Sequence, residues 1–210
     1  MMIYSEKFVW LHFPKCAGTK VEQLFRKYFS TQDRLVQDRV NAKLDPTIAW
    51  HDSIDDREAR DRGFVLGERI VICSFRRLPS WLESRYNFEA ERSPHLAHRP
   101  ELLLEGKFLE ARGVESHADV YSKKYLPDRI LQSGKVRFLR TEYFESDFKR
   151  IFADFVDVSR IPDWEFKERL NSSKGCCLPA RVRDQLYDGR GTVYDKCPHW
   201  RSIDEIAYGV

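Results

Sequence analysis

The stretch FVWLHFPKCAGTKVEQLF, residues 8–25, predicts a buried strand, a tight turn and an amphipathic helix in succession. Large apolar side chains alternate over residues 7–12, which is typical of a strand. Over residues 18–29 the apolar positions recur at helical spacing, at Val21, Leu24, Phe25 and Tyr28. A turn that leaves a strand and opens a helix directs several N–H groups at one place, where the helix also adds partial positive charge. The stretch therefore predicts an anion-binding turn.

Three residues of this turn suit an anion. Gly18 lets the backbone approach a ligand closely, Thr19 can donate a hydroxyl hydrogen bond, and Lys15 brings a mobile cation. A nucleotide-binding Walker loop would read G-x-x-x-x-G-K-[ST], but here the lysine precedes the glycine and no leading glycine is present. Cys16 suggests a phosphatase loop, which would need an arginine six positions on, where Glu22 stands. The alternative reading is an ordinary strand–helix turn with incidental polar residues.

Strands and helices alternate along the rest of the chain. Short or continuous apolar runs at 47–51, 69–75 and 135–140 predict strands, and residues 53–62, 79–92, 142–156 and 179–189 predict helices. Ser53 is the predicted N-cap of its helix. Residues 93–134 are expected to be helical, with breaks at Pro94, Pro100, Gly113 and Pro127. This order predicts a parallel sheet with helices on both faces, in one domain spanning residues 1–210.

The composition narrows the class of protein. The chain has 210 residues, 42% of them hydrophobic and 33% charged, which is typical of a soluble globular domain. A net charge of +3 is too small to indicate nucleic-acid binding. No apolar run approaches the roughly 20 residues that a membrane helix needs, and the first residues do not resemble a signal peptide. Five cysteines, an odd number, favour a reducing compartment, so we expect a cytoplasmic protein of undetermined oligomeric state.

The segment HFPKCAGTK, residues 12–20, resembles the PK(T/C)GGTS turn of the sulfotransferases, particularly the carbohydrate sulfotransferases and their bacterial relatives. In that family the turn binds the 5′-phosphosulfate of the donor 3′-phosphoadenosine 5′-phosphosulfate (PAPS). The resemblance implies a three-layer, P-loop-like α/β fold with a central parallel sheet flanked by helices. It also implies that the 5′-phosphosulfate is bound by Lys15, Cys16, Ala17, Gly18, Thr19 and Lys20. Threonine is commoner at position 16 and glycine at 17, but neither difference removes a backbone donor.

A second anion site follows the strand predicted at 69–75. Arg76 and Arg77 stand at its carboxyl end, where α/β sheets place ligands, and their guanidinium groups suit phosphate. The segment resembles the family pattern R-D-P-x-x-R-x-x-S-x-Y, with Arg76, Ser84 and Tyr86 in register. The resemblance implies that Arg76 and Ser84 bind the 3′-phosphate of the donor. Arg77 replaces an aspartate of the pattern and Pro79 is shifted by one place. The alternative is an arginine pair that caps a strand.

A third segment, NSSKGCCL at 171–178, resembles the late K-G loop of the same enzymes, which implies that Ser173, Lys174 and Gly175 close over the nucleotide. The region of Arg140 and Glu142 also resembles the family, and these two residues are expected to support the framework. A rival reading groups four residues as zinc ligands, namely Cys176, Cys177, Cys197 and His199. Adjacent cysteines do not easily occupy two corners of one tetrahedron, so this reading is disfavoured and no metal is expected.

Sulfuryl transfer requires in-line positioning and stabilisation of charge on the leaving phosphate. Lys15 is the expected stabiliser of the bridging oxygen, and His51 is the expected base for the acceptor's proton, a role that the resemblance also implies. Asp52 and Asp55 are the alternative bases, and His51 could instead cap the following helix. His12 is expected to be structural.

The sequence also allows two other functions: a P-loop-type nucleotide kinase or NTPase, and a non-catalytic nucleotide-binding relative. The acceptor is not identified by the sequence. We expect a small molecule or a glycan, bound by the variable stretches 31–46 and 93–134, and we expect no nucleic-acid partner and no membrane segment.

Overall fold

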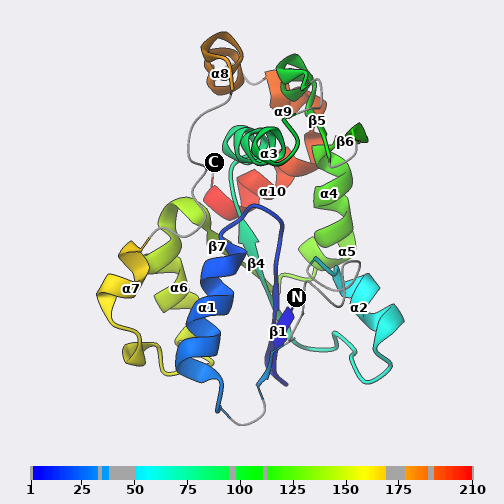
Figure 1. The fold of residues 1–210 in the computed structure, drawn as a ribbon. Helices are drawn as coiled ribbons and strands as arrows, with labels where there is room; N and C mark the ends of the chain where they lie inside the picture. Colours follow the sequence, from blue (N-terminus) through cyan, green and yellow to red (C-terminus); the bar gives the residue numbers. More distant parts are fainter. Residues whose placement is uncertain are drawn as a thin grey trace. The chain divides into compact units, whose positions relative to one another are not determined.

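The computed structural model describes residues 2–32, 35–37, 51–94, 98–110, 113–168, 178–188 and 192–209. The chain divides into two compact units. The first contains Met1–Phe75 and Tyr125–Asn171, and the second contains Arg76–Lys124 and Ser172–Val210. Figure 1 shows the elements with their labels.

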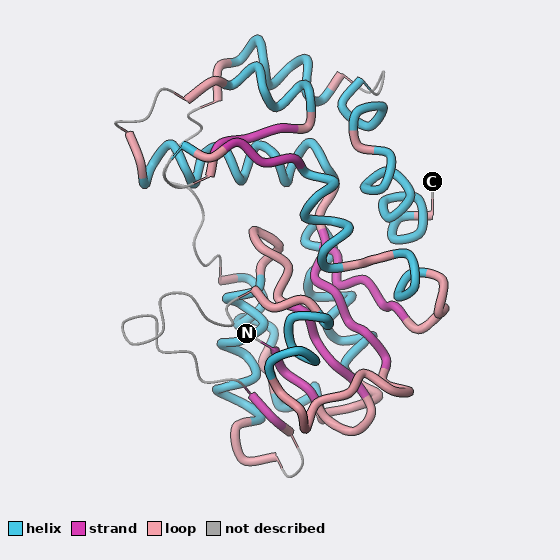
Figure 2. The backbone as a smooth tube through the Cα atoms, turned by 90° about the vertical axis from the view of Figure 1, so that its right-hand side faces the viewer, coloured by secondary structure: helices cyan, strands magenta, loops and turns pink. Residues whose placement is uncertain are grey.

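The first unit is built on a five-stranded sheet. Its order is β3 (Val36–Gln37), β1 (Met2–Tyr4), β2 (Phe8–Leu11), β4 (Ile70–Phe75) and β7 (Val136–Arg140), and Figure 2 shows these strands side by side. Strands β2, β4 and β7 are parallel, whereas β1 is antiparallel to both β2 and β3. The sheet is therefore mixed, and the prediction of a parallel sheet is correct only for these three strands. The three residues between β1 and β2 are too few for a crossover, so the two strands must be antiparallel.

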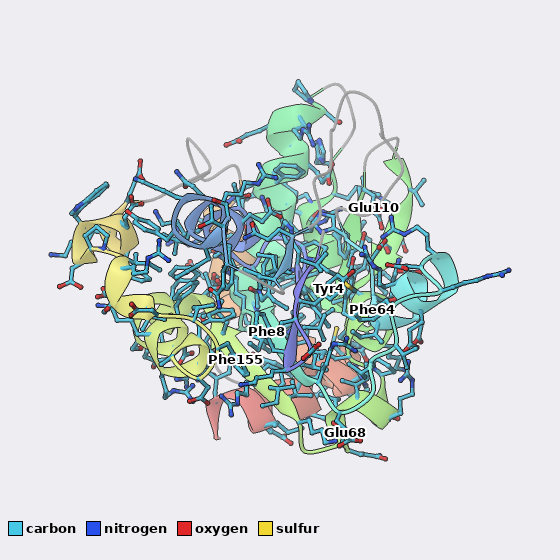
Figure 3. All side chains as sticks on the ribbon, turned by 90° about the horizontal axis from the view of Figure 1, so that it is seen from below. Tyr4, Phe8, Phe64, Glu68, Glu110 and Phe155 are labelled. Atoms are coloured by element: carbon cyan, nitrogen blue, oxygen red, sulfur yellow. The ribbon has the colours of Figure 1, made fainter. Side chains whose placement is uncertain are left out.

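One face of the sheet carries α1 (Gly18–Phe29) and α6 (Phe144–Phe152). Helix α1 starts at the predicted residue, and α6 starts two residues after the predicted one. The apolar side chains of both helices pack on alternate residues of the strands, including Phe8 and Trp10. Phe8 also contacts Phe155, with ring centroids 4.7 Å apart, and Figure 3 labels both rings. The same unit contains α5 (Asp128–Leu131), α7 (Asp163–Lys167) and two 3₁₀ turns, η3 (Thr141–Tyr143) and η4 (Val158–Arg160).

The opposite face of the sheet carries α2 (Ile54–Arg60). Tyr4 of β1 packs edge-on against Phe64 at 5.1 Å, and its hydroxyl accepts a hydrogen bond from Arg57 at 3.1 Å. Figure 3 labels Tyr4 and Phe64. Ser53 caps the helix and forms a reciprocal capping box with Asp56, which confirms the predicted cap.

The second unit is mainly helical. Its elements are α3 (Leu78–Arg92), the 3₁₀ helix η1 (Pro100–Glu105), the strands β5 (Lys107–Leu109) and β6 (Glu115–His117), α8 (Ala180–Tyr187), α9 (Thr192–Lys196) and α10 (Pro198–Tyr208). Helix α4 (Ala118–Tyr125) runs to the boundary with the first unit. The core gathers around Trp81, whose ring lies 4.6 Å from Trp200 and 5.2 Å from Phe108.

The prediction that residues 93–134 are helical with breaks is wrong at 107–109 and 115–117. Residues 107–109 and 115–117 form the antiparallel pair β5–β6, with Lys107 opposite His117. Phe108 of β5 is buried against Trp81, and this packing favours the extended backbone over the weak local helical pattern.

Asp119 of α4 caps α10. Its two carboxylate oxygens accept from the backbone N–H groups of His199 and Trp200, at 3.0 and 2.9 Å, and Cys197 makes no side-chain cap of its own.

In the part of the chain that is described, none of the helices combines the length and apolar character needed to cross a bilayer.

Candidate functional site

The turn predicted to bind an anion joins the carboxyl end of β2 to the start of α1 at Gly18. Lys15 and Ala17 both have positive φ angles, 63° and 59°. This left-handed conformation costs roughly 1–2 kcal/mol for a residue with a side chain. Such strain concentrates at functional sites, and alternation with left-handed residues forms concave nests of N–H groups that suit anions.

Two further features of the first turn of α1 favour a bound anion. Its N-cap, Ala17, makes no side-chain cap hydrogen bond, and the turn contains no acidic residue. The first N–H groups of a helix have no acceptor within the helix, and the dipole adds partial positive charge there. An external anion is the natural partner for such a helix start.

Gly18 is required for a reason that the sequence did not indicate. A Cβ atom at this position would lie 2.0 Å from both Cδ2 and Nε2 of His12, closer than any real contact. His12 is itself stacked on Trp10, with ring centroids 5.5 Å apart. Glycine is therefore needed here because the backbone passes close to the His12 imidazole beneath the turn.

The side chains of the turn differ in their surroundings. Lys15 is partly exposed and Thr19 is exposed. Cys16 is buried, so only its backbone could serve a ligand. Burial, with a smaller contribution from Cys16, raises the pKa of Cys73 well above its ordinary value, and both are free thiols.

Lys20 is buried and faces two carboxylates, one within α7 and one just after that helix. Its Nζ lies 3.6 Å from Glu168 and 3.9 Å from Glu165. A hydrogen bond from Lys27 is the main reason that the pKa of Glu165 is lowered, and Tyr28 also donates to this carboxylate at 2.8 Å. The assignment of Lys20 to the 5′-phosphosulfate remains a prediction, and in this structure its charge is balanced by the two glutamates.

His51 lies in a turn and is tied to the end of β2. Its Nδ1 is 3.1 Å from the carbonyl oxygen of His12, and its own carbonyl accepts a hydrogen bond from the Tyr125 hydroxyl at 2.7 Å. A carbonyl oxygen can only accept, so Nδ1 carries the proton and Nε2 is the basic nitrogen of the neutral ring. Ser53 caps α2, so the alternative in which His51 caps that helix is wrong. Of the strand predicted at 47–51, residues 47–50 lie outside the described residues, and His51 is in a turn.

The two alternative bases are both engaged with arginines. Asp52 forms an ion pair with Arg60, and Asp55 forms one with Arg129. Each carboxylate would have to give up its guanidinium partner before it could act on an acceptor. The geometry therefore favours His51 over either aspartate.

Arg76 follows the last residue of β4, as predicted, and Ser84 lies within α3, partly buried. Among the described residues, the Nε atom of Arg76 is buried and has no hydrogen-bond partner. The Arg76 carbonyl accepts from the Trp200 indole at 3.3 Å, which fixes its backbone. Arg77, where the family pattern has aspartate, places its guanidinium over the Tyr208 ring at 4.1 Å.

The other predicted residues either lie outside the described part of the chain or stabilise the fold. Ser173, Lys174 and Gly175 lie outside the described residues, as do Cys176 and Cys177 of the rival zinc reading. Cys197 is a free thiol whose pKa burial raises to about 12. Across the described ranges, no group of three or more His, Cys, Asp or Glu residues is arranged to hold a metal ion. Arg140 makes a two-pronged ion pair with Asp147, at 2.7 and 2.9 Å, as expected of a framework residue.

Sequence reasoning missed two residues of this region. Glu22 carries a buried carboxylate whose Oε1 lies 2.8 Å from Nδ1 of His12, and an acidic residue on a helix face that is otherwise apolar was the available signal. Tyr125 holds His51 from 74 positions away, and no local pattern could have connected them.

A comparison with protein-family models found no match, and comparisons with curated proteins and with solved structures found none either.

Proposed function

We propose that this protein is a sulfotransferase that transfers a sulfuryl group from PAPS to a hydroxyl or amine of a small-molecule or glycan acceptor. The observation that carries the proposal is the strained turn between β2 and α1, where Lys15 and Ala17 are left-handed at the start of a helix with no acidic residue in its first turn. The finer fold assignment, a three-layer P-loop-like arrangement, belongs to the same proposal.

The residues present fit the charge of the donor. The turn offers backbone N–H groups and Lys15 for the 5′-phosphosulfate, with Thr19 exposed beside them. The buried Nε of Arg76, which has no partner among the described residues, is suited to an anionic ligand, and we assign the 3′-phosphate to Arg76 and Ser84. Ser173, Lys174 and Gly175 remain assigned to the nucleotide by resemblance alone.

The chain's own contribution to the reaction is positioning, charge stabilisation and proton removal. When bound, the donor supplies the activated sulfuryl group. Lys15 would stabilise negative charge at the bridging oxygen, and the Nε2 atom of His51 would accept the proton of the acceptor hydroxyl or amine. The hydrogen bond from Nδ1 to the His12 carbonyl supports this role because it leaves Nε2 as the basic nitrogen.

The competing functions predict different behaviour. A nucleotide kinase or NTPase would require ATP with magnesium, and the turn lacks the G-K-[ST] element of such enzymes. A non-catalytic binding protein would need no base, so the arrangement around His51 argues against it.

A transfer assay with labelled PAPS and a panel of glycans, phenols, lipids and small alcohols tests the proposal. The wild type should label at least one acceptor class. His51→Ala should lower turnover by about 10²–10⁴ while leaving the affinity for adenosine 3′,5′-bisphosphate unchanged. Asp52→Asn is the matched control and should retain most of the activity, because Asp52 is paired with Arg60. A dead Asp52→Asn beside an active His51→Ala would assign the base to the carboxylate.

A further inference from the structure

The buried pair of His12 and Glu22 lies directly beneath the turn. Each residue is only 6% exposed, and His12 Nδ1 is 2.8 Å from Glu22 Oε1. A buried carboxylate is costly unless a polar group lies against it, and the His12 imidazole is the group that lies against this one. The pair connects the end of β2 to the second turn of α1.

The His12 ring is held on several sides. It stacks on Trp10 at an interplanar angle of 24°, packs against Gly18, and meets the ring of His51 edge-on at a centroid distance of 4.6 Å. Trp10 is itself fixed by a hydrogen bond from its indole to Ser74 at 3.0 Å. The imidazole therefore has little freedom to rotate.

We propose that His12 and Glu22 are positioning residues that hold His51 as the Nδ1–H tautomer, ready to accept a proton at Nε2. This inference rests on the proposed function. The carbonyl that accepts from His51 belongs to His12, so fixing the His12 side chain also fixes the direction of that carbonyl. The same side chain packs against Gly18, so one residue sets the position of both the base and the first turn of α1.

The alternative is that the pair only stabilises the fold. In that case its loss would lower stability, and any loss of turnover would be independent of His51. If the pair acts through His51, removing the pair should disturb the tautomer of His51. Removing the pair should then have no further effect on turnover in a protein that already lacks His51.

The tautomer can be measured without any turnover, from ring ¹⁵N shifts in protein with labelled histidine. The wild-type spectrum should show His51 as the Nδ1–H form. Glu22→Leu should give a mixture of tautomers, whereas Glu22→Gln should keep the wild-type form because it has nearly the same shape and keeps an oxygen beside His12 Nδ1. His98 is an internal reference, since its Nε2 bonds to the Ser93 carbonyl at 2.8 Å and should stay Nε2–H throughout. An unchanged His51 signal in Glu22→Leu would overturn the inference.

The second arm is a double-mutant cycle on turnover. Glu22→Leu should lower kcat by about tenfold or more, in line with the cost of misplacing a catalytic group. It should add no further loss in the His51→Ala background. Glu68→Leu, at an exposed glutamate paired with Lys135, is the matched control and should leave kcat unchanged. An equal loss in both backgrounds would reduce the pair to a purely structural role.

Two safeguards keep the outcomes separate. If Glu22→Leu does not fold, His12→Phe can replace it as the test of whether the pair positions His51. This variant keeps a ring over Gly18 and on Trp10 but removes the partner of Glu22. If the wild type transfers sulfate to no acceptor, the proposed function fails, while the tautomer spectrum still shows whether His12 and Glu22 position His51.

Discussion

Gly18 has no room for a side chain, because the His12 imidazole occupies the space where its Cβ would lie. Gly18→Ala would place its Cβ 2.0 Å from the ring, and the ring is fixed by Trp10 and Glu22. We expect a loss of about 1–3 kcal/mol in the free energy of unfolding, measured by urea denaturation.

Gly63→Ala is the matched control for this prediction. A Cβ at Gly63 would meet only Asp61 Oδ1, at 3.3 Å, and that side chain can move. A stability loss for Gly18→Ala no larger than that for Gly63→Ala would contradict the packing described for His12.

Lys15 tests the chemistry at the residue scale. If its ammonium group stabilises the departing phosphate, Lys15→Ala should lower turnover by about 10²–10³ and weaken donor binding far less. Steady-state kinetics combined with calorimetric titration of adenosine 3′,5′-bisphosphate separates the two effects. Unchanged turnover would remove Lys15 from the reaction.

Residue-scale prediction succeeded where the cause is local and failed where it is not. The Ser53 cap follows from three neighbouring residues and is confirmed. The sequence indicated that Gly18 matters, but it did not show that the reason is the nearby His12 ring. The Glu22 partner was missed because a charged residue on a helix is usually solvated, and only packing shows that this one is buried.

Helix α6 is anchored to β7 by Asp147. Its carboxylate accepts from the backbone and side chain of Arg140 and from Arg150 at 3.0 Å. Burial alone would raise the pKa of Asp147, but the hydrogen bonds from these arginines outweigh it, and the pKa is lowered. The ionised form is therefore favoured by folding.

Asp147→Asn should cost about 2 kcal/mol at neutral pH, because it removes charge-assisted hydrogen bonds. A lowered folded pKa means that this stability is fully present above the ordinary carboxyl value of 3.8 and is lost as the pH falls through the lowered pKa. The gap between wild type and variant should therefore shrink below pH 3.8 in urea titrations. Asp154→Asn, which breaks an exposed pair with Arg137, is the control and should have little effect. A gap that stays constant with pH would show that folding does not lower the pKa of Asp147.

At the scale of elements, long periodic segments were predicted well. The strands β2, β4 and β7 and the helices α1, α3 and α6 lie close to their predicted bounds. The pair β5–β6 was missed because each strand has three residues, too few for a period to show, and because their pairing depends on Phe108 packing under Trp81.

At the scale of the whole molecule, local motifs pointed to the turn, Arg76 and His51, but they did not show the contacts that connect these residues to the rest of the fold. The turn and Arg76 stand at predicted strand and helix boundaries, and Ser84 lies within the helix predicted at 79–92. The contacts of His51 with His12 and Tyr125 span 39 and 74 positions, and only the folded chain brings these residues together. The antiparallel β1 and β3 also depend on pairing that no period in the sequence encodes.

The central claim is that this protein binds a nucleotide with separate 5′ and 3′ anionic groups, and calorimetry tests it most directly. We predict that the wild type binds adenosine 3′,5′-bisphosphate without magnesium, and more tightly than adenosine 5′-monophosphate or ATP with magnesium. Arg76→Ala should weaken the bisphosphate by about tenfold or more and barely change the monophosphate, because one charge-assisted contact is lost. Tighter binding of ATP with magnesium, or no binding of the bisphosphate, would contradict the proposed function.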